Sequence, residues 1–143
     1  MSGAQAEIRQ LIERRIAAIR DKDARRAVDC LASDVVAFEM VPPLALPAGA
    51  ASDAEGFAAW LAGFETIDVE VRDLAIEADG DTGFAHALHH LIGTRAGGGS
   101  VSVWMRSTLG FRRGPDGWRI VHSHTSVPFH PGPEAKPALD LEP

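Results

Sequence analysis

The sequence predicts an α+β domain in which three helices cover a strongly curved antiparallel sheet, giving a cone. Apolar residues recur at helical spacing near the N-terminus, whereas residues 67–129 have the alternation and turn spacing of long antiparallel strands. Helices that precede such a sheet pack on one of its faces. The 143 residues fit one compact domain, so we expect a single domain over 1–143 with a proline-rich tail at 130–143.

The helical part begins with an amphipathic segment. Its apolar stripe consists of Ile8, Leu11, Ile12, Ile16 and Ile19. Asp23 is the expected N-cap of a short second helix that closes at Ser33 and Asp34. Its inward residues would be Ala27, Val28 and Leu31.

The next elements are a strand, a loop and a third helix. Residues 35–41 are mostly β-branched and apolar, which predicts a strand, and Pro42 and Pro43 must end it. After a loop at 44–51, Ser52 and Glu55 form a capping-box pattern. One face of the third helix would carry Phe57, Trp60, Leu61 and Phe64.

Three turn signals divide the remaining sheet into four long strands. They are 79–81 (Asp-Gly-Asp), 97–99 (Gly-Gly-Gly) and 114–117 (Gly-Pro-Asp-Gly). The strands between them are about 11 to 14 residues long, and strands of that length coil strongly and often contain bulges. A bent sheet covered by helices forms an open cone, in which we expect a ligand pocket.

Composition excludes two classes of partner. The net charge of −6 disfavours nucleic acid, whose phosphates require a basic face. No stretch approaches the ~18 apolar residues of a membrane span. Cys30 is the single cysteine, so no intrachain disulfide can form, and we expect it to be buried and inert in a helical stretch. A cytoplasmic protein is the expectation.

Glu39 is the first candidate catalytic residue. Strand alternation places it with Val35 and Ala37, and places Phe38 and Met40 on the other face. A carboxylate in this apolar strand requires a partner or a wet cavity, and desolvation would raise its pKa toward the range of a general base. The alternative is an exposed or ion-paired glutamate at the strand end.

A second candidate set is Trp104, Arg106 and Thr108, which share one strand face. Arg106 could hold a carboxylate, phosphate or enolate oxygen through its planar guanidinium, and Trp104 could form a stacking wall. Alternatively, Arg106 forms an internal ion pair with Glu39 that only shapes the cone.

Histidines form the third set. His122, His124 and Ser126 alternate on one strand face, together with Trp118 and Ile120. Two histidines at this spacing can bind a metal, but a further ligand would have to come from His86 or His90, so we predict no metal site. A hydrogen-bonded or proton-transferring role fits the histidines better. His89 has the opposite parity to His86 and His90 and is expected to face outward or into a dimer interface.

Several segments together resemble one family. They are 34–44 (DVVAFEMVPPL), 103–108 (VWMRST), 117–129 (GWRIVHSHTSVPF) and the closing 138–143 (ALDLEP). With the order of elements, they look like the SnoaL-like, ketosteroid isomerase-like branch of the nuclear transport factor 2-like superfamily. The resemblance spans nearly the whole chain and implies the cone fold and a homodimer formed through the outer sheet face. It does not determine a reaction.

The chain departs from ketosteroid isomerases, whose oxyanion hole uses a tyrosine and a protonated aspartic acid. This chain has no tyrosine; Arg15 stands where the family has it, and no acid occurs at 107–109, where the aspartic acid is expected. Glu39 occupies a position resembling that of the general-base aspartate.

Two hypotheses follow. In the first, the protein is a cofactor-independent isomerase, dehydratase or cyclase acting on a carbonyl compound. Glu39 abstracts a proton, and Arg106 with His122 or His124 stabilises the oxyanion. The ligand contacts would be Trp104, Thr108, Phe38, Met40, Trp60 and Ser126. In the second, the protein binds a hydrophobic ligand or forms homodimers without catalysis.

Overall fold

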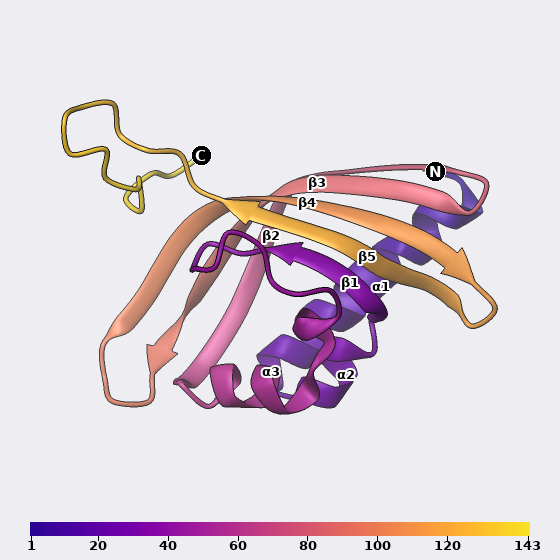
Figure 1. Ribbon diagram of the computed structural model, residues 1–143, viewed down its shortest axis with the longest axis horizontal. Coiled ribbons are helices and arrows are strands. Elements are labelled where there is room, and N and C mark those ends of the chain that lie inside the picture. Colours follow the sequence, from indigo (N-terminus) through magenta and orange to yellow (C-terminus); the bar gives the residue numbers. More distant parts are fainter.

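The computed structural model describes residues 1–143 and has nine elements. The helical elements are α1 (Gly3–Arg20), α2 (Ala24–Val28), the 3₁₀ turn η1 (Ala50–Ser52) and α3 (Ala54–Leu61). The strands are β1 (Leu31–Phe38), β2 (Phe64–Asp79), β3 (Thr82–Arg95), β4 (Ser100–Gly114) and β5 (Gly117–Ser126). The expected α+β order of elements is therefore confirmed (Figure 1).

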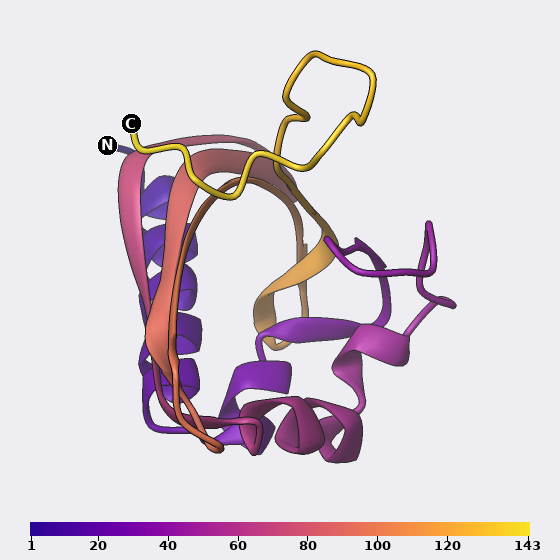
Figure 2. The same ribbon diagram turned by 90° about the vertical axis from the view of Figure 1, so that its left-hand side faces the viewer.

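The five strands form one open sheet in the order β1-β5-β4-β3-β2. Strands β2 to β5 pair antiparallel as expected, but β1 pairs parallel with β5, so the sheet is mixed rather than wholly antiparallel. Figure 2 shows the sheet bending into an arch, with α2 and α3 beneath its opening. Because β1 and β2 are not paired with each other, the cone is open and not a closed barrel.

Helix α1 fills one half of the concave face. Ser2 caps it through a capping box with Gln5. The helical stripe buries Ile8, Leu11 and Ile12 against residues from all five strands. That core cluster also contains Cys30, Leu31, Val35, Ile76, Ala85, Phe111, Trp118 and Ile120.

The second helix is shorter than predicted. It is capped by Asp23 as expected, but it ends at Val28, and Leu31 is the first residue of β1. Leu31 pairs with Ile120 of β5, so sheet pairing overrides the helical pattern and draws Ser33 into the strand. Cys30 is buried, but it lies in the turn between the two elements rather than in a helix.

The third helix differs from the prediction at both ends. Its N-cap is Asp53, which accepts from the backbone N–H of Glu55 and Gly56, whereas the Ser52 hydroxyl donates to the Gly49 carbonyl. Phe64 opens β2 instead of closing the helix. A second core cluster forms here from Ala18, Ile19, Ala27, Leu61, Phe64 and Ile67.

Two β-bulges change which residues share a face. On β5, Gly110 pairs with His122 and Phe111 with Ile120, which leaves Val121 as an extra residue. Trp118 and Ile120 therefore lie in the core, while His122 and His124 lie on the other face, contrary to the predicted common face. The second bulge, between Arg72 and Ala75 of β2, includes Asp73 at a φ of 58°.

The predicted turns and tail are observed, with one addition. β2 ends at Asp79 and β3 begins at Thr82, so the turn at Gly80 lies where it was expected. The tail has no helix or strand but folds back on itself: Phe129 bridges Pro137, and Ala138 is buried. None of the helices combines the length and hydropathy needed to cross a membrane.

Candidate functional site

Strand pairing assigns every strand residue to the concave or the convex face of the sheet. On the concave side, Ser107 of β4 pairs with Ala87 of β3 and Thr125 of β5. One position along, Met105 pairs with His89, which pairs with Val71 of β2. This second row is only half-buried, so α1 does not fill the concave face beside it.

The residues predicted to surround the substrate lie mainly on the convex face. Arg106 pairs with Leu88 and Ser126, and Thr108 pairs with His86 and His124. Val36 of β1 pairs with His122. This row has the opposite parity to Ser107 and therefore points away from the helices.

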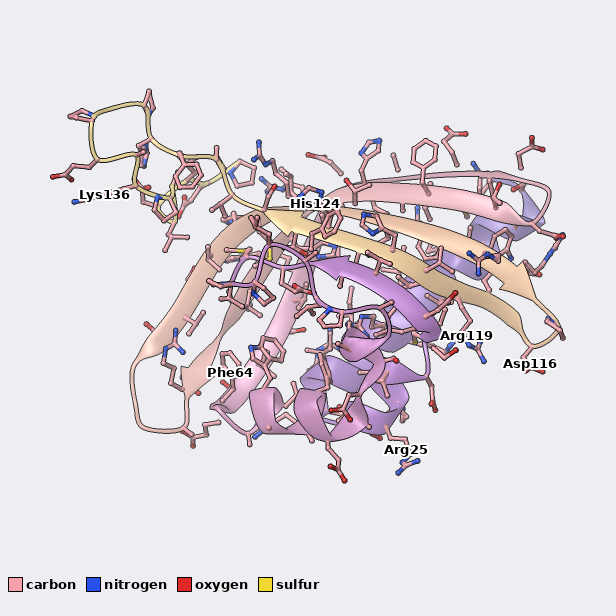
Figure 3. The ribbon with its side chains drawn as sticks, viewed as in Figure 1. Arg25, Phe64, Asp116, Arg119, His124 and Lys136 are labelled. Atoms are coloured by element: carbon pink, nitrogen blue, oxygen red, sulfur yellow. The ribbon has the colours of Figure 1, made fainter.

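The convex side chains contact one another across the strands. The ring of Phe38 lies 5.0 Å from that of His122 and 5.4 Å from that of His124, edge to face. His122 Nδ1 lies 2.7 Å from the Val36 carbonyl oxygen. Both histidines therefore pack on surface side chains, and His122 also contacts the edge strand β1. Figure 3 shows His124 near the end of β5, where the tail begins.

Trp104 belongs to a second convex group. It stacks on His90 at 4.4 Å, and the Arg72 guanidinium carbon lies 5.5 Å from the Trp104 ring centroid. His90 in turn contacts a Glu70 carboxylate oxygen at 3.3 Å and the Ser102 hydroxyl at 2.8 Å. Trp104 is thus a convex-face residue and not a wall of the concave site.

The histidines are not gathered into a metal site. His86 and His124 pair with the same residue, Thr108, from opposite sides, so two strand spacings of about 4.8 Å each separate them. No group of three or more His, Cys, Asp or Glu side chains is placed to hold a metal ion.

Arg15 is the concave residue that the sequence reasoning did not select. It lies on α1 between Leu11 and Ile19, in the stripe that faces the core. Its Nη1 donates to the Ala27 carbonyl oxygen at 2.7 Å, and its guanidinium carbon lies 5.4 Å from the Phe57 ring centroid. An arginine at the i+4 position from one buried leucine and the i−4 position from a buried isoleucine is the signal that identifies it.

Glu39 follows β1 at the mouth of the concave side. Its side chain reaches solvent, but the surrounding protein hinders its hydration and raises the pKa of the carboxyl, while the Arg15 charge acts in the lowering direction. Because the Arg15 charge affects the pKa of Glu39, the Glu39 carboxyl lies within electrostatic range of the Arg15 guanidinium. No ion pair joins Glu39 to Arg106, so the predicted alternative of an internal salt bridge is wrong.

His89 corrects a second prediction. It was expected to face outward or into a dimer interface, but it lies in the concave row with Met105 and Val71. Burial, together with the Arg15 charge, lowers the pKa of His89 to about 4. Its imidazole is consequently neutral at pH 7 and offers one N–H donor and one acceptor.

The predicted ligand contacts outside the sheet lie in exposed positions. Trp60 is 45% exposed on α3, where its ring lies 5.5 Å from Phe57 and 5.1 Å from Phe64. Met40 is exposed in the loop after β1. Neither shares a contact with Arg106, His122 or His124 among the aromatic and hydrogen-bonded pairs.

Two surface depressions lie beside α2 and the edge strand β1. One, of about 250 Å³, is lined by Arg14, Arg26, Asp29, Cys30 and Arg119. The other, of about 500 Å³, is lined by Val28, Asp29, Leu31, Ala32, Ser33, Ser52 and Arg119. Both are open to solvent. The concave face is the stronger candidate site because the Arg15 charge acts there on the ionisation of both Glu39 and His89.

The open, helix-covered cone defines an α+β protein of the nuclear transport factor 2-like superfamily. The chain belongs to the SnoaL-like domain family, whose model matches residues 8–130. A nuclear transport factor 2-like protein of unknown function from Pseudomonas putida KT2440 is 32% identical, with a TM-score of 0.86 over 100% of this chain and 99% of that one. A search of curated protein sequences finds no match.

More distant structures support the fold alone. A provisionally named dehydratase from Streptomyces avermitilis is 18% identical, with a TM-score of 0.74 over 85% of this chain and 93% of that one. A provisionally named ketosteroid isomerase from Shewanella frigidimarina is 20% identical, with a TM-score of 0.70 over 87% and 98%. Their different names agree with the rule that this fold hosts many reactions.

Proposed function

We propose that the protein binds a small carbonyl compound on the concave face and that Glu39 removes a proton from the carbon next to the carbonyl. The observation that supports this function is the grouping of a carboxyl of raised pKa and a neutral imidazole around Arg15. A base with a raised pKa accepts a proton from carbon more readily than an ordinary carboxylate does.

The proposed step uses two of this chain's residues. An ionised Glu39 oxygen takes the proton, and the C–H electron pair moves into the carbonyl to give an enolate. The N–H of neutral His89 donates to the enolate oxygen, and a neutral histidine can act in this way when its pKa is lowered. If the enolate is conjugated with a carbon–carbon double bond, returning the Glu39 proton to the far carbon isomerises the substrate. If the substrate has a β-hydroxyl, the enolate electrons form a C=C bond as the C–O bond breaks, and the Glu39 proton completes the departing water.

A steroid isomerase is not proposed. The chain has no tyrosine, and Ser107, which is buried, stands in the region where the isomerases have their aspartic acid. Arg106, His122 and His124 have no part in the proposed step because their row faces away from Glu39.

Hydrogen–deuterium exchange tests the proposal. Phenylpyruvate and its methyl ester, incubated in D₂O, would exchange their C3 protons faster with the protein than without it, as followed by NMR. Glu39→Gln should lower the protein-dependent rate by about 10²-fold or more, because it removes the base. Glu77→Gln, an exposed change on β2, should leave the rate unchanged. Equal rates for wild type and Glu39→Gln would contradict the proposal.

The second candidate function is a non-catalytic homodimer formed through the convex face. It is supported by the exposure of Phe84 and Val36 on that face. The stacked Trp104 and His90 lie elsewhere on the same face. Sedimentation velocity should show a dimer that Phe84→Glu dissociates and that Leu44→Glu, in the exposed loop after β1, does not. A wild-type protein that sediments as a monomer would contradict the proposed homodimer. A cytoplasmic location belongs to the same proposal and is supported by the free thiol of Cys30.

A further inference from the structure

Arg15 is a cation inside the molecule without a counterion. No carboxylate oxygen lies within 4.0 Å of its guanidinium, since none of the ion pairs includes it. Its single side-chain hydrogen bond goes to the neutral Ala27 carbonyl. Charges in protein interiors are normally paired, so this arrangement leaves a positive charge to be balanced.

The remaining N–H groups of Arg15 are accessible. A guanidinium has five N–H donors, and only one donor nitrogen of Arg15 has a partner. No enclosed side-chain nitrogen or oxygen in the molecule lacks a hydrogen-bond partner. The unused donors must therefore border space that a water molecule or a ligand atom can reach.

No neighbouring ionisable group forms an ion pair with Arg15. Glu39 acts on the charge of Arg15 from a distance, but no carboxylate oxygen of Glu39 lies within 4.0 Å of the guanidinium. Burial also raises the pKa of the Cys30 thiol, so the sulfur is protonated at pH 7. His89 can only add positive charge. An anion in direct contact with the Arg15 guanidinium therefore has to come from outside the chain.

The surroundings of Arg15 indicate the chemistry of the rest of the ligand that would carry this anion. Phe57 lies against the guanidinium, and half-buried apolar side chains cover the concave face next to it. These are Val69, Leu91, Val101 and Met105. A ligand here meets one cation and an apolar surface, which suits an acid with a hydrocarbon or aromatic body more than a phosphate ester or a sugar.

We propose that Arg15 binds the carboxylate of a small apolar carboxylic acid through its free N–H groups on the concave face. The planar guanidinium matches a carboxylate in two parallel hydrogen bonds. The inference rests on the proposed function in one respect: the acid also carries the carbonyl next to which Glu39 removes a proton. Keto acids are therefore the substrate class.

Binding of acids and esters, measured separately from the exchange reaction described above, tests the role of Arg15. Phenylpyruvate and hexanoate, with their neutral methyl esters, are titrated into the full-length protein labelled at its histidine rings, and the His89 resonances report binding. Wild type should bind each acid at least tenfold more tightly than its ester. Arg15→Gln should lose at least tenfold in affinity for the acids and little for the esters. Arg15→Lys should bind the acids with intermediate affinity, because it keeps the charge but loses the planar fork.

Arg14→Gln is the matched control, since Arg14 is the adjacent but exposed residue. Circular dichroism and thermal unfolding establish that each variant is folded, and Arg15→Lys tests the inference if Arg15→Gln is not. Equal binding of acids and esters, unchanged acid affinity in the folded Arg15 variants, or no binding of either acid at millimolar concentration would overturn the inference.

The two proposals fail in different ways. If acid binding depends on Arg15 but hydrogen–deuterium exchange does not depend on Glu39, the anion site is supported and the proposed catalysis is wrong. If exchange depends on Glu39 but is equally fast for phenylpyruvate and its ester, and Arg15→Gln has no effect, the catalysis is supported and the anion site is wrong.

Discussion

The two faces of the sheet carry similar residue types in different physical settings. The convex face presents Arg106, His122 and His124, which pair across strands and pack on surface aromatics such as Phe38. The concave face presents Arg15 and His89, which protein surrounds on most sides. Enclosure rather than residue type is what shifts a pKa, because desolvation penalises the charged form.

The comparison also explains why α1 and two of the predicted sets, the one around Arg106 and the histidines of β5, point to different sites. These sets were selected because chemistry-bearing residues alternate along strands, and alternation defines a face without telling which face is covered. Helix α1 covers the face to which Ile120 and Phe111 belong, and the extra residue Val121 moves His122 out of it. A single inserted residue thus separates the histidines from the candidate site.

The largest expected difference between the faces is in packing energy. Phe111→Ala on the concave side should lower the free energy of unfolding by about 3–5 kcal/mol, because it leaves a cavity among buried residues. Phe84→Ala on the convex side, where the ring is 49% exposed, should cost less than about 1 kcal/mol. Urea unfolding at pH 7 measures both. Similar losses for the two variants would show that a partner covers the convex face.

A smaller difference is expected in the pH dependence of stability. His89 has an ordinary pKa of 6.5 when unfolded and about 4 in the fold. Between these values the unfolded chain binds more protons, so stability is fully present above about pH 6.5 and falls as the pH is lowered toward 4. At about 1.4 kcal/mol for each tenfold change in proton affinity, the His89 contribution is at most roughly 3–4 kcal/mol.

Urea unfolding at pH 7 and pH 4.5 measures this contribution as a difference between variants. His89→Gln should remove part of the loss of stability, whereas His86→Gln, an exposed histidine on the convex face, should leave it as in wild type. An identical loss in wild type and His89→Gln would show that His89 titrates normally and lies in water.

The smallest expected effect concerns the field of Arg15. The Arg15 charge lowers the pKa of both Glu39 and His89, so Arg15→Gln should raise both values, by less than about one pH unit each. Arg106→Gln, on the other face, should change neither. NMR titration of the His89 ring and the Glu39 carboxyl measures these pKa values. Opposite or absent pKa changes in Arg15→Gln would show that Arg15 does not act on Glu39 and His89.

Much of the fold could be predicted from local patterns. The apolar stripe of α1, the Asp23 cap and the turn at Gly80 depend on neighbours in sequence, and all three are observed. Several of the wrong predictions are those in which a distant strand decides: Leu31 joins β1 because it pairs with Ile120. The Ser52 cap is wrong for a local reason, because Asp53 stands one residue closer to the helix.

The candidate site could be predicted only in part. Glu39 was identified from an acid in an apolar strand, and its raised pKa agrees with that reasoning. Arg15 carried a readable signal, an arginine within a buried helical stripe, whereas His89 carried none, because its parity alone was compatible with either face. Which of two alternating faces is covered depends on how helices dock, and no single strand contains that information.

The sequence by itself thus determined the class of elements, their order, the turns and one acidic residue of the candidate site. The tertiary structure alone decided that β1 runs parallel to β5 and that Arg15 and His89 lie on the same, concave face. It also placed Arg106 and the His122–His124 pair on the far side. The physical reason is that periodicity records local geometry, whereas bulges, strand pairing and helix docking arise from contacts between residues far apart in the chain.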